Sequence, residues 1–182
     1  PRYLHYYENM DKLYYHLDMH VICGPDGHVI INSMRLAVNL ILDELKKGQD
    51  LPRYFKEKNL SYVRRFLMVI ADVYETVDQK IKETLEVAGF EVHMAPLMIC
   101  APGGGIAMSM ANGLPGLTRE GTHIYYVAEP SNTIEKRMLQ EFKNTVNKIF
   151  PLEILEIKYA HEMMQKTLSG LHCVFTPASV YT

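Results

Sequence analysis

The chain of 182 residues contains 48% hydrophobic and 22% charged residues, which is the composition of an ordinary globular domain. Its net charge of −2 and its lack of a basic block argue against non-specific binding of nucleic acid. No apolar run reaches the roughly 18 residues of a membrane span, and the three cysteines show no CxxC spacing. We therefore expect one α/β domain over residues 1–182, in the reducing cytoplasm and without contacts to nucleic acid or membrane.

The first half of the chain predicts a hairpin, two helices and a further strand. Residues 16–23 alternate as a strand does, 24–27 read as a turn, and 28–31 form the returning strand. Asn32 or Ser33 is expected to cap a helix up to about Lys47. Its apolar face should carry Leu36, Val38, Leu40, Ile41 and Leu45.

A second, longer helical stretch is expected from about Ser61 to Ala88, with a break near Ala71-Asp72 and an end at Gly89. The segment 90–96 after it reads as a strand. A helix, a glycine and a strand in succession are typical of α/β proteins.

The second half repeats the alternation of strands and helices. We expect strands over 106–112, 123–128, 153–157 and 170–176, helices over 132–149 and 160–168, and loops over 101–105 and 114–121. Ser131 or Asn132 should cap the helix that begins near 132.

Two groups of residues could carry chemistry. On a strand, His16 and Asp18 would project from the same face, where an imidazole can transfer a proton and a carboxylate can hold a cation. A solvated strand face would show the same pattern. Adding His20 gives three potential metal ligands, but their spacing matches no strong metal signature, and no metal or cofactor is expected.

The cysteines Cys23, Cys100 and Cys173 are each candidates for a thiol nucleophile. A buried small hydrophobic side chain is the commonest fate of a free cysteine. Cys173 stands apart because it follows His172 in a segment that begins at Gly170.

Taken together, these motifs resemble the guanidine-modifying pentein superfamily, and most closely its agmatine and protein-arginine deiminases. The resemblance rests on His16-Leu17-Asp18 and on Gly170-Leu171-His172-Cys173. His16 of the first motif and Cys173 of the second lie 157 residues apart. Between them, Ala111-Asn112-Gly113 and a helix ending at Phe150-Pro151 follow the order found in agmatine deiminases.

The resemblance implies part of an α/β propeller built from ββαβ units. It also implies that Cys173 attacks a guanidinium carbon, that His16 acts as acid and then as base, and that Asp18 holds the guanidinium. Hydrolysis would give a ureido product such as citrulline. The further substrate-binding residues would be Asn112, Gly170 and His172.

In the family a second carboxylate comes from far upstream, whereas only fifteen residues precede His16 here, Glu8 and Asp11 among them. The resemblance therefore implies the C-terminal blades of a propeller that a second chain or a cleaved N-terminal segment would complete. Free arginine, agmatine and protein-bound arginine all stay open as substrates. An amidinotransferase, a non-enzymatic binding or assembly subunit with the pentein fold, and a chance match of motifs are the alternatives.

Overall fold

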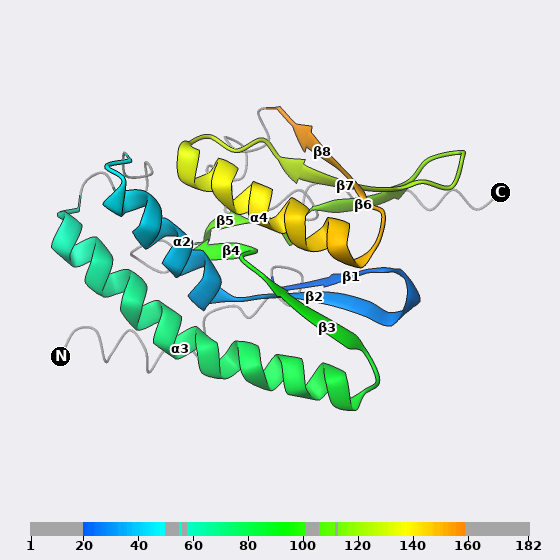
Figure 1. Ribbon diagram of the computed structural model, residues 1–182, viewed down its shortest axis with the longest axis horizontal. Coiled ribbons are helices and arrows are strands. Elements are labelled where there is room, and N and C mark those ends of the chain that lie inside the picture. Colours follow the sequence, from blue (N-terminus) through cyan, green and yellow to red (C-terminus); the bar gives the residue numbers. More distant parts are fainter. Residues whose placement is uncertain (1–19, 50–54, 56–57, 101–105, 112, 159–182) are drawn as a thin grey trace.

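The computed structural model describes residues 20–49, 55, 58–100, 106–111 and 113–158 (Figure 1). This part of the chain forms three α-helices and three small sheets, which confirms the expected α/β class. None of these helices is both long enough and apolar enough to cross a lipid bilayer. The expected loop 101–105, helix 160–168 and strand 170–176 lie outside the described residues.

The first sheet has the order β1-β2-β3. The expected hairpin is confirmed, because β1 (Val21–Cys23) runs antiparallel to β2 (His28–Asn32) across a short 3-10 turn at Pro25–Gly27. Asp26 and Gly27 both have positive φ in this turn, at 54° and 79°. The third strand, β3 (Glu91–Ala95), pairs with β2 in parallel, so the two need a long crossover connection.

Two helices form that crossover. The helix α2 (Met34–Lys46) begins at Ser33, whose hydroxyl accepts a hydrogen bond from the Leu36 amide, as expected for a cap. The helix α3 (Leu60–Val87) runs for 28 residues without interruption, so the break expected near Ala71-Asp72 is wrong. Ala71 is buried in the core and Asp72 binds Arg35 of α2, so both positions suit a continuous helix packed on another.

The third sheet has the order β6-β7-β8 and repeats this arrangement. Strand β6 (Leu114–Leu117) is antiparallel to β7 (His123–Ala128), and β8 (Glu153–Ile157) is parallel to β7. The loop expected over 114–121 is therefore partly wrong. Pro115 and Gly116 suggested a turn, but β6 pairs only with β7 in the described structure, and proline is tolerated on such an edge strand.

The helix α4 (Thr133–Ile149) connects β7 to β8 and confirms the expected helix. Asn132 is its cap, because the side-chain oxygen accepts from the Glu135 amide at 3.0 Å. The Glu135 carboxylate in turn accepts from the amide and the hydroxyl of Ser131. These reciprocal bonds are those of a capping box, shifted by one residue.

Each of the two units is thus a hairpin, a helical connection and a third strand parallel to the second. The connection has two helices in the first unit (ββααβ) and one helix in the second (ββαβ). A two-stranded sheet of β4 (Met98–Cys100) and β5 (Ile106–Ser109) lies between them in the sequence. The sequence predicted a longer version of β5 and did not predict β4. Asn32, at the end of β2, holds the approach to β4 by accepting hydrogen bonds from the amides of Leu97 and Met98.

The core forms around α2, which lies between α3 and α4 (Figure 1). Its buried stripe is Met34, Ala37, Val38, Ile41 and Leu45. Leu36, expected on this face, is instead 44% exposed. The stripe begins at Met34 and continues at i+3, i+4 and i+7, a spacing that leaves Leu36 on the outer side of the helix.

Candidate functional site

The residues that the sequence singled out for catalysis and substrate binding all lie outside the described residues: His16, Asp18, Asn112, Gly170, His172 and Cys173. The structure therefore gives no distance between any of them. It does describe residues next to two of these motifs, and it brings together other chemically active side chains that the sequence analysis did not combine.

The residue that follows the HxD motif most closely in the described chain is His20. It is buried, and its ring stacks on Tyr74 of α3 with centroids 6.0 Å apart. Its carbonyl oxygen accepts a hydrogen bond from the amide of Asn32, at the far end of the hairpin. The chain that leaves the HxD motif is thus fixed to β2 and α3 within two residues of Asp18.

The segment that carries Asn112 is held from both sides by one hydroxyl group. Tyr125 of β7 donates to the carbonyl of Ala111 at 2.5 Å and accepts from the amide of Gly113 at 3.1 Å. Gly113 is required here, because a Cβ atom would lie 2.5 Å from the Tyr125 ring and would also collide with the carbonyl oxygen of Tyr126. The neighbours of Asn112 are therefore tightly constrained.

A cluster of His28, Glu91 and His93 lies on the parallel pair of β2 and β3. The register places His28 directly opposite Glu91, and side chains two residues apart on a strand share a face, which adds His93. The Nδ1 atom of His28 is 3.1 Å from Nε2 of His93. Glu91 approaches both rings, with Oε2 at 3.6 Å from His28 and Oε1 at 3.4 Å from His93.

The cluster is partly open to solvent. The side chains of His28 and His93 are 22% and 24% exposed, whereas that of Glu91 is 67% exposed. The ring of Phe150, at the end of α4, lies behind His28 with the centroids 6.2 Å apart. Two imidazoles and a carboxylate whose donor atoms lie within 4.8 Å of one another could hold a metal ion.

The sequence analysis missed this cluster because its members come from strands separated by more than sixty residues. One local signal was present: Glu91 and His93 occupy positions i and i+2 of a segment that was expected to be a strand. Their partner, His28, could be found only from the parallel pairing and its register.

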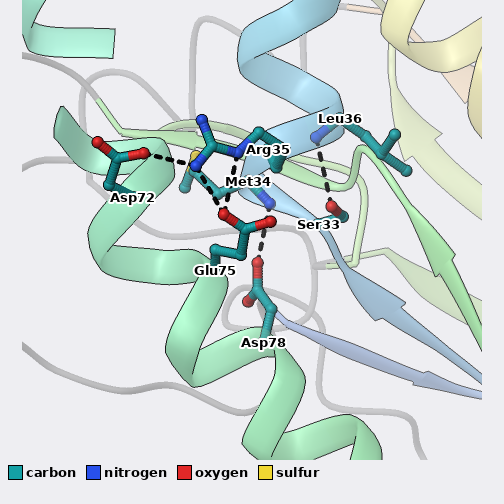
Figure 2. A network of polar contacts seen from close by, with 7 residues as sticks. All are labelled: Ser33, Met34, Arg35, Leu36, Asp72, Glu75 and Asp78. Carbon is teal, nitrogen blue, oxygen red and sulfur yellow. Dashed lines mark hydrogen bonds and ion pairs between the residues drawn. The ribbon is translucent and has the colours of Figure 1, made fainter. Parts of the chain in front are cut away.

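A second polar cluster joins α2 to α3 (Figure 2). Arg35 of α2 donates to Asp72 at 2.5 Å and to Glu75 at 2.6 Å, both on α3. Deeper in the interface, Oδ2 of Asp78 accepts a hydrogen bond from the Met34 amide at 2.9 Å, at the start of α2. Burial, against the effect of this hydrogen bond and with a smaller contribution from the charge of Glu75, raises the pKa of Asp78 to about 7.

Cys23 is the one cysteine whose side chain the structure describes, and it is exposed. The expectation of a buried cysteine is therefore wrong at this position. Cys23 lines an open apolar groove of about 590 Å³ between β1 and α3, together with Val21, Val77, Ile81 and Leu85. It occupies the end of β1, next to the turn, where the third residue of a short strand need not face the core.

Comparison with known proteins found no match to this chain among protein-family models, curated proteins or solved structures.

Proposed function

We propose that this protein is a cysteine-dependent hydrolase of guanidinium groups, with the fold and chemistry of the pentein superfamily. The observation that carries the proposal is a hairpin followed by a helical connection and a third strand parallel to the second, which occurs twice in the described residues: with two helices in the first unit, and with one helix, as ββαβ, in the second. A propeller built from such units is the fold that the resemblance implies. Because one fold can serve many activities, the HxD and cysteine motifs carry the chemical part of the proposal.

In this proposal the thiolate of Cys173 attacks the guanidinium carbon, and a C–S bond forms as a C–N bond breaks. His16 donates a proton to the departing nitrogen, which leaves as ammonia, and then takes a proton from the attacking water. Water adds to the thiouronium carbon, the C–S bond breaks, and the thiol returns with a ureido product such as citrulline. Asp18 holds the guanidinium by charge-assisted hydrogen bonds.

The remaining substrate contacts come from Asn112, Gly170 and His172. Support for including Asn112 comes from its neighbours, because the Tyr125 hydroxyl fixes both Ala111 and Gly113. A propeller needs more blades than these two units, and a second chain or another segment of the protein would complete it. The thiol nucleophile must be reduced, which fits a cytoplasmic protein.

The test is to measure ureido product from arginine, agmatine and an arginine-containing peptide. We expect product with the unaltered chain, and a loss of at least about 1000-fold in rate with Cys173→Ala, because the nucleophile is gone. The matched control is Cys23→Ala, which removes an exposed thiol that lies outside the motif and should leave the rate unchanged.

Equal rates with and without the Cys173 thiol would contradict the proposal. Transfer of the amidino group to an added amine, without ureido product, would instead identify an amidinotransferase. If none of the three substrates reacts in either assay, this chain alone is not an active hydrolase. It is then either a part that needs the second chain or segment that completes the propeller, or a binding or assembly subunit, and a copurifying partner would distinguish the two.

A further inference from the structure

We infer that His28, Glu91 and His93 form a binding site for a divalent transition-metal ion, with Zn²⁺ as the ion that fits it best. This site is separate from the residues of the proposed hydrolase and does not depend on that proposal. The distances between the donor atoms, the chemistry of the donors and the strands that carry them all support this site.

The distances between donor atoms match those around a small tetrahedral ion. Ligand atoms at about 2.0–2.1 Å from Zn²⁺ lie about 3.4 Å from one another. Here the two imidazole nitrogens are 3.1 Å apart, Oε1 of Glu91 lies 3.4 Å from the His93 nitrogen, and Oε2 lies 3.6 Å from the His28 nitrogen. With one ligand atom from each residue, all three atoms lie within 4.8 Å of one another, so small side-chain movements would complete the site. The three side chains therefore already converge as the ligands of one ion would.

The types of donor select the class of ion. Two imidazole nitrogens and one carboxylate oxygen suit Zn²⁺ and other late first-row metals, whereas Ca²⁺ and Mg²⁺ prefer oxygen ligands alone. Three protein ligands leave at least one position of a tetrahedral ion free. The exposure of Glu91 gives solvent or a further ligand access to that position.

The backbone makes the cluster rigid. All three residues belong to β2 or β3, and the ladder from His28–Glu91 to Asn32–Ala95 fixes their register. Phe150 supports the His28 ring, and Gly24 leaves room for this, because a Cβ there would lie 2.5 Å from the Phe150 ring. A site held on strands loses little conformational freedom when an ion binds.

The second ββαβ unit shows that the sheet itself does not require the two histidines. Its register pairs Ile124 with Glu153, as the first unit pairs His28 with Glu91. The position equivalent to His93 is Leu155. The second unit thus has the carboxylate but apolar residues in place of both imidazoles, and it forms the same strand pairing.

Without the ion, the contact between the facing nitrogens of His28 and His93 requires that one of them carries a proton. An ion bound by both nitrogens takes the place of this proton, and the neutral ring then carries its proton on the other ring nitrogen. The cluster would then exchange one hydrogen bond for coordination bonds that connect β2 to β3.

The experiment is a calorimetric titration of the full, untagged, metal-free chain with Zn²⁺, together with His28→Gln, His93→Gln and Glu91→Gln. We expect the unaltered chain to bind one ion at this site, and each histidine variant to bind it at least about 100-fold more weakly, since a direct ligand is lost. The matched control is His123→Gln, because His123 is an exposed histidine at the start of β7, in the unit without the cluster. It should bind as the unaltered chain does.

Two further measurements keep the result unambiguous. Without metal, all variants should unfold at the same temperature as the unaltered chain. Zn²⁺ should raise the melting temperature of the unaltered chain and of His123→Gln, but not that of the three ligand variants. Co²⁺ should give the visible bands of a tetrahedral site without a thiolate charge-transfer band. No Zn²⁺ binding, unchanged affinity in all three variants, or a thiolate band that reports cysteine ligands would overturn the inference.

Discussion

Asp78 places a carboxyl group in the interface between α2 and α3, where only 2% of the residue is exposed. Its Oδ2 atom accepts from the first amide of α2, and Oδ1 has no hydrogen-bond partner among the described residues (Figure 2). Loss of water raises its pKa from an ordinary value near 3.8 to about 7. The folded protein therefore keeps a proton on Asp78 over a pH range in which the unfolded chain has lost it.

This difference sets the direction of a pH effect on stability. Between about pH 4 and pH 7 the folded state binds one proton more than the unfolded state, so the free energy of unfolding falls as the pH rises through this range. Asp78→Asn keeps an oxygen acceptor for the Met34 amide and removes the charge. At pH 8 we expect it to be more stable than the unaltered chain by on the order of 2–4 kcal/mol, with little difference at pH 4.

Urea denaturation at a series of pH values measures this effect. The control is Asp43→Asn, an exposed carboxylate of α2 whose pKa is lowered by its hydrogen bond to Lys46. Because the pKa of Asp43 is lowered and not raised in the folded chain, its replacement should not remove the fall in stability between pH 4 and pH 7. If the free energy of unfolding of Asp78→Asn still falls between pH 4 and pH 7, another group is responsible for the pH dependence.

Gly113 gives a second prediction at the scale of one residue. A Cβ there would overlap the Tyr125 ring and the Tyr126 carbonyl, whereas at Gly116, three residues along the chain, it would make an ordinary contact of 3.5 Å. Gly113→Ala should therefore cost about 1–3 kcal/mol of stability through overpacking. Gly116→Ala should be neutral or slightly stabilising, since it lowers the entropy of the unfolded chain. Chemical denaturation of both variants measures the difference. Similar losses of stability in Gly113→Ala and Gly116→Ala would contradict this prediction.

At the scale of the elements, the structure depends on α2, which packs between two other helices. Its start is capped by Ser33 and joined to α3 by Arg35 and Asp78, and its buried stripe faces the core. The exposed ion pairs of Arg35 add little, because water screens such pairs. Packing of the apolar stripe is the larger contribution.

Two variants of α2 test this view. Ile41→Ala removes a fully buried side chain and should destabilise the protein by about 2–5 kcal/mol, including the cost of the cavity. Leu36→Ala removes a side chain of the same size from the exposed side of the helix and should cost less than about 1 kcal/mol. Thermal or urea denaturation measures the stability of both variants. Equal losses of stability would show that Leu36 packs against the core as Ile41 does.

At the scale of the whole molecule, both units pair a hairpin with a third, parallel strand, but they place different side chains on these strands. Both have a carboxylate at the first residue of the third strand, Glu91 in one unit and Glu153 in the other. Only the first unit adds the two imidazoles, and only it carries a motif with the form of a guanidine-modifying site immediately before its first strand. The inferred metal site therefore belongs to this unit, and the HxD motif directly precedes it in the sequence, whereas the proposed nucleophile Cys173 follows the second unit.

The sequence by itself determined the features that depend on neighbours in the chain. Alternating side chains and the turn at 24–27 predicted the hairpin, and Ser33 and Asn132 were identified as possible helix caps, because these signals act within a few residues. The same holds for the strands at 123–128 and 153–157. The HxD and cysteine motifs stay predictions, because their residues lie outside the described chain.

Only the tertiary structure decided the features that depend on distant partners. Asp72 suggested a break in α3 until Arg35 of α2 was found beside it, and Pro115 suggested a loop until β7 paired with it. The cluster of His28, Glu91 and His93 arises in the same way. His28 lies more than sixty residues from Glu91 and His93 in sequence, and the parallel register brings the donor atoms of all three within 4.8 Å of one another.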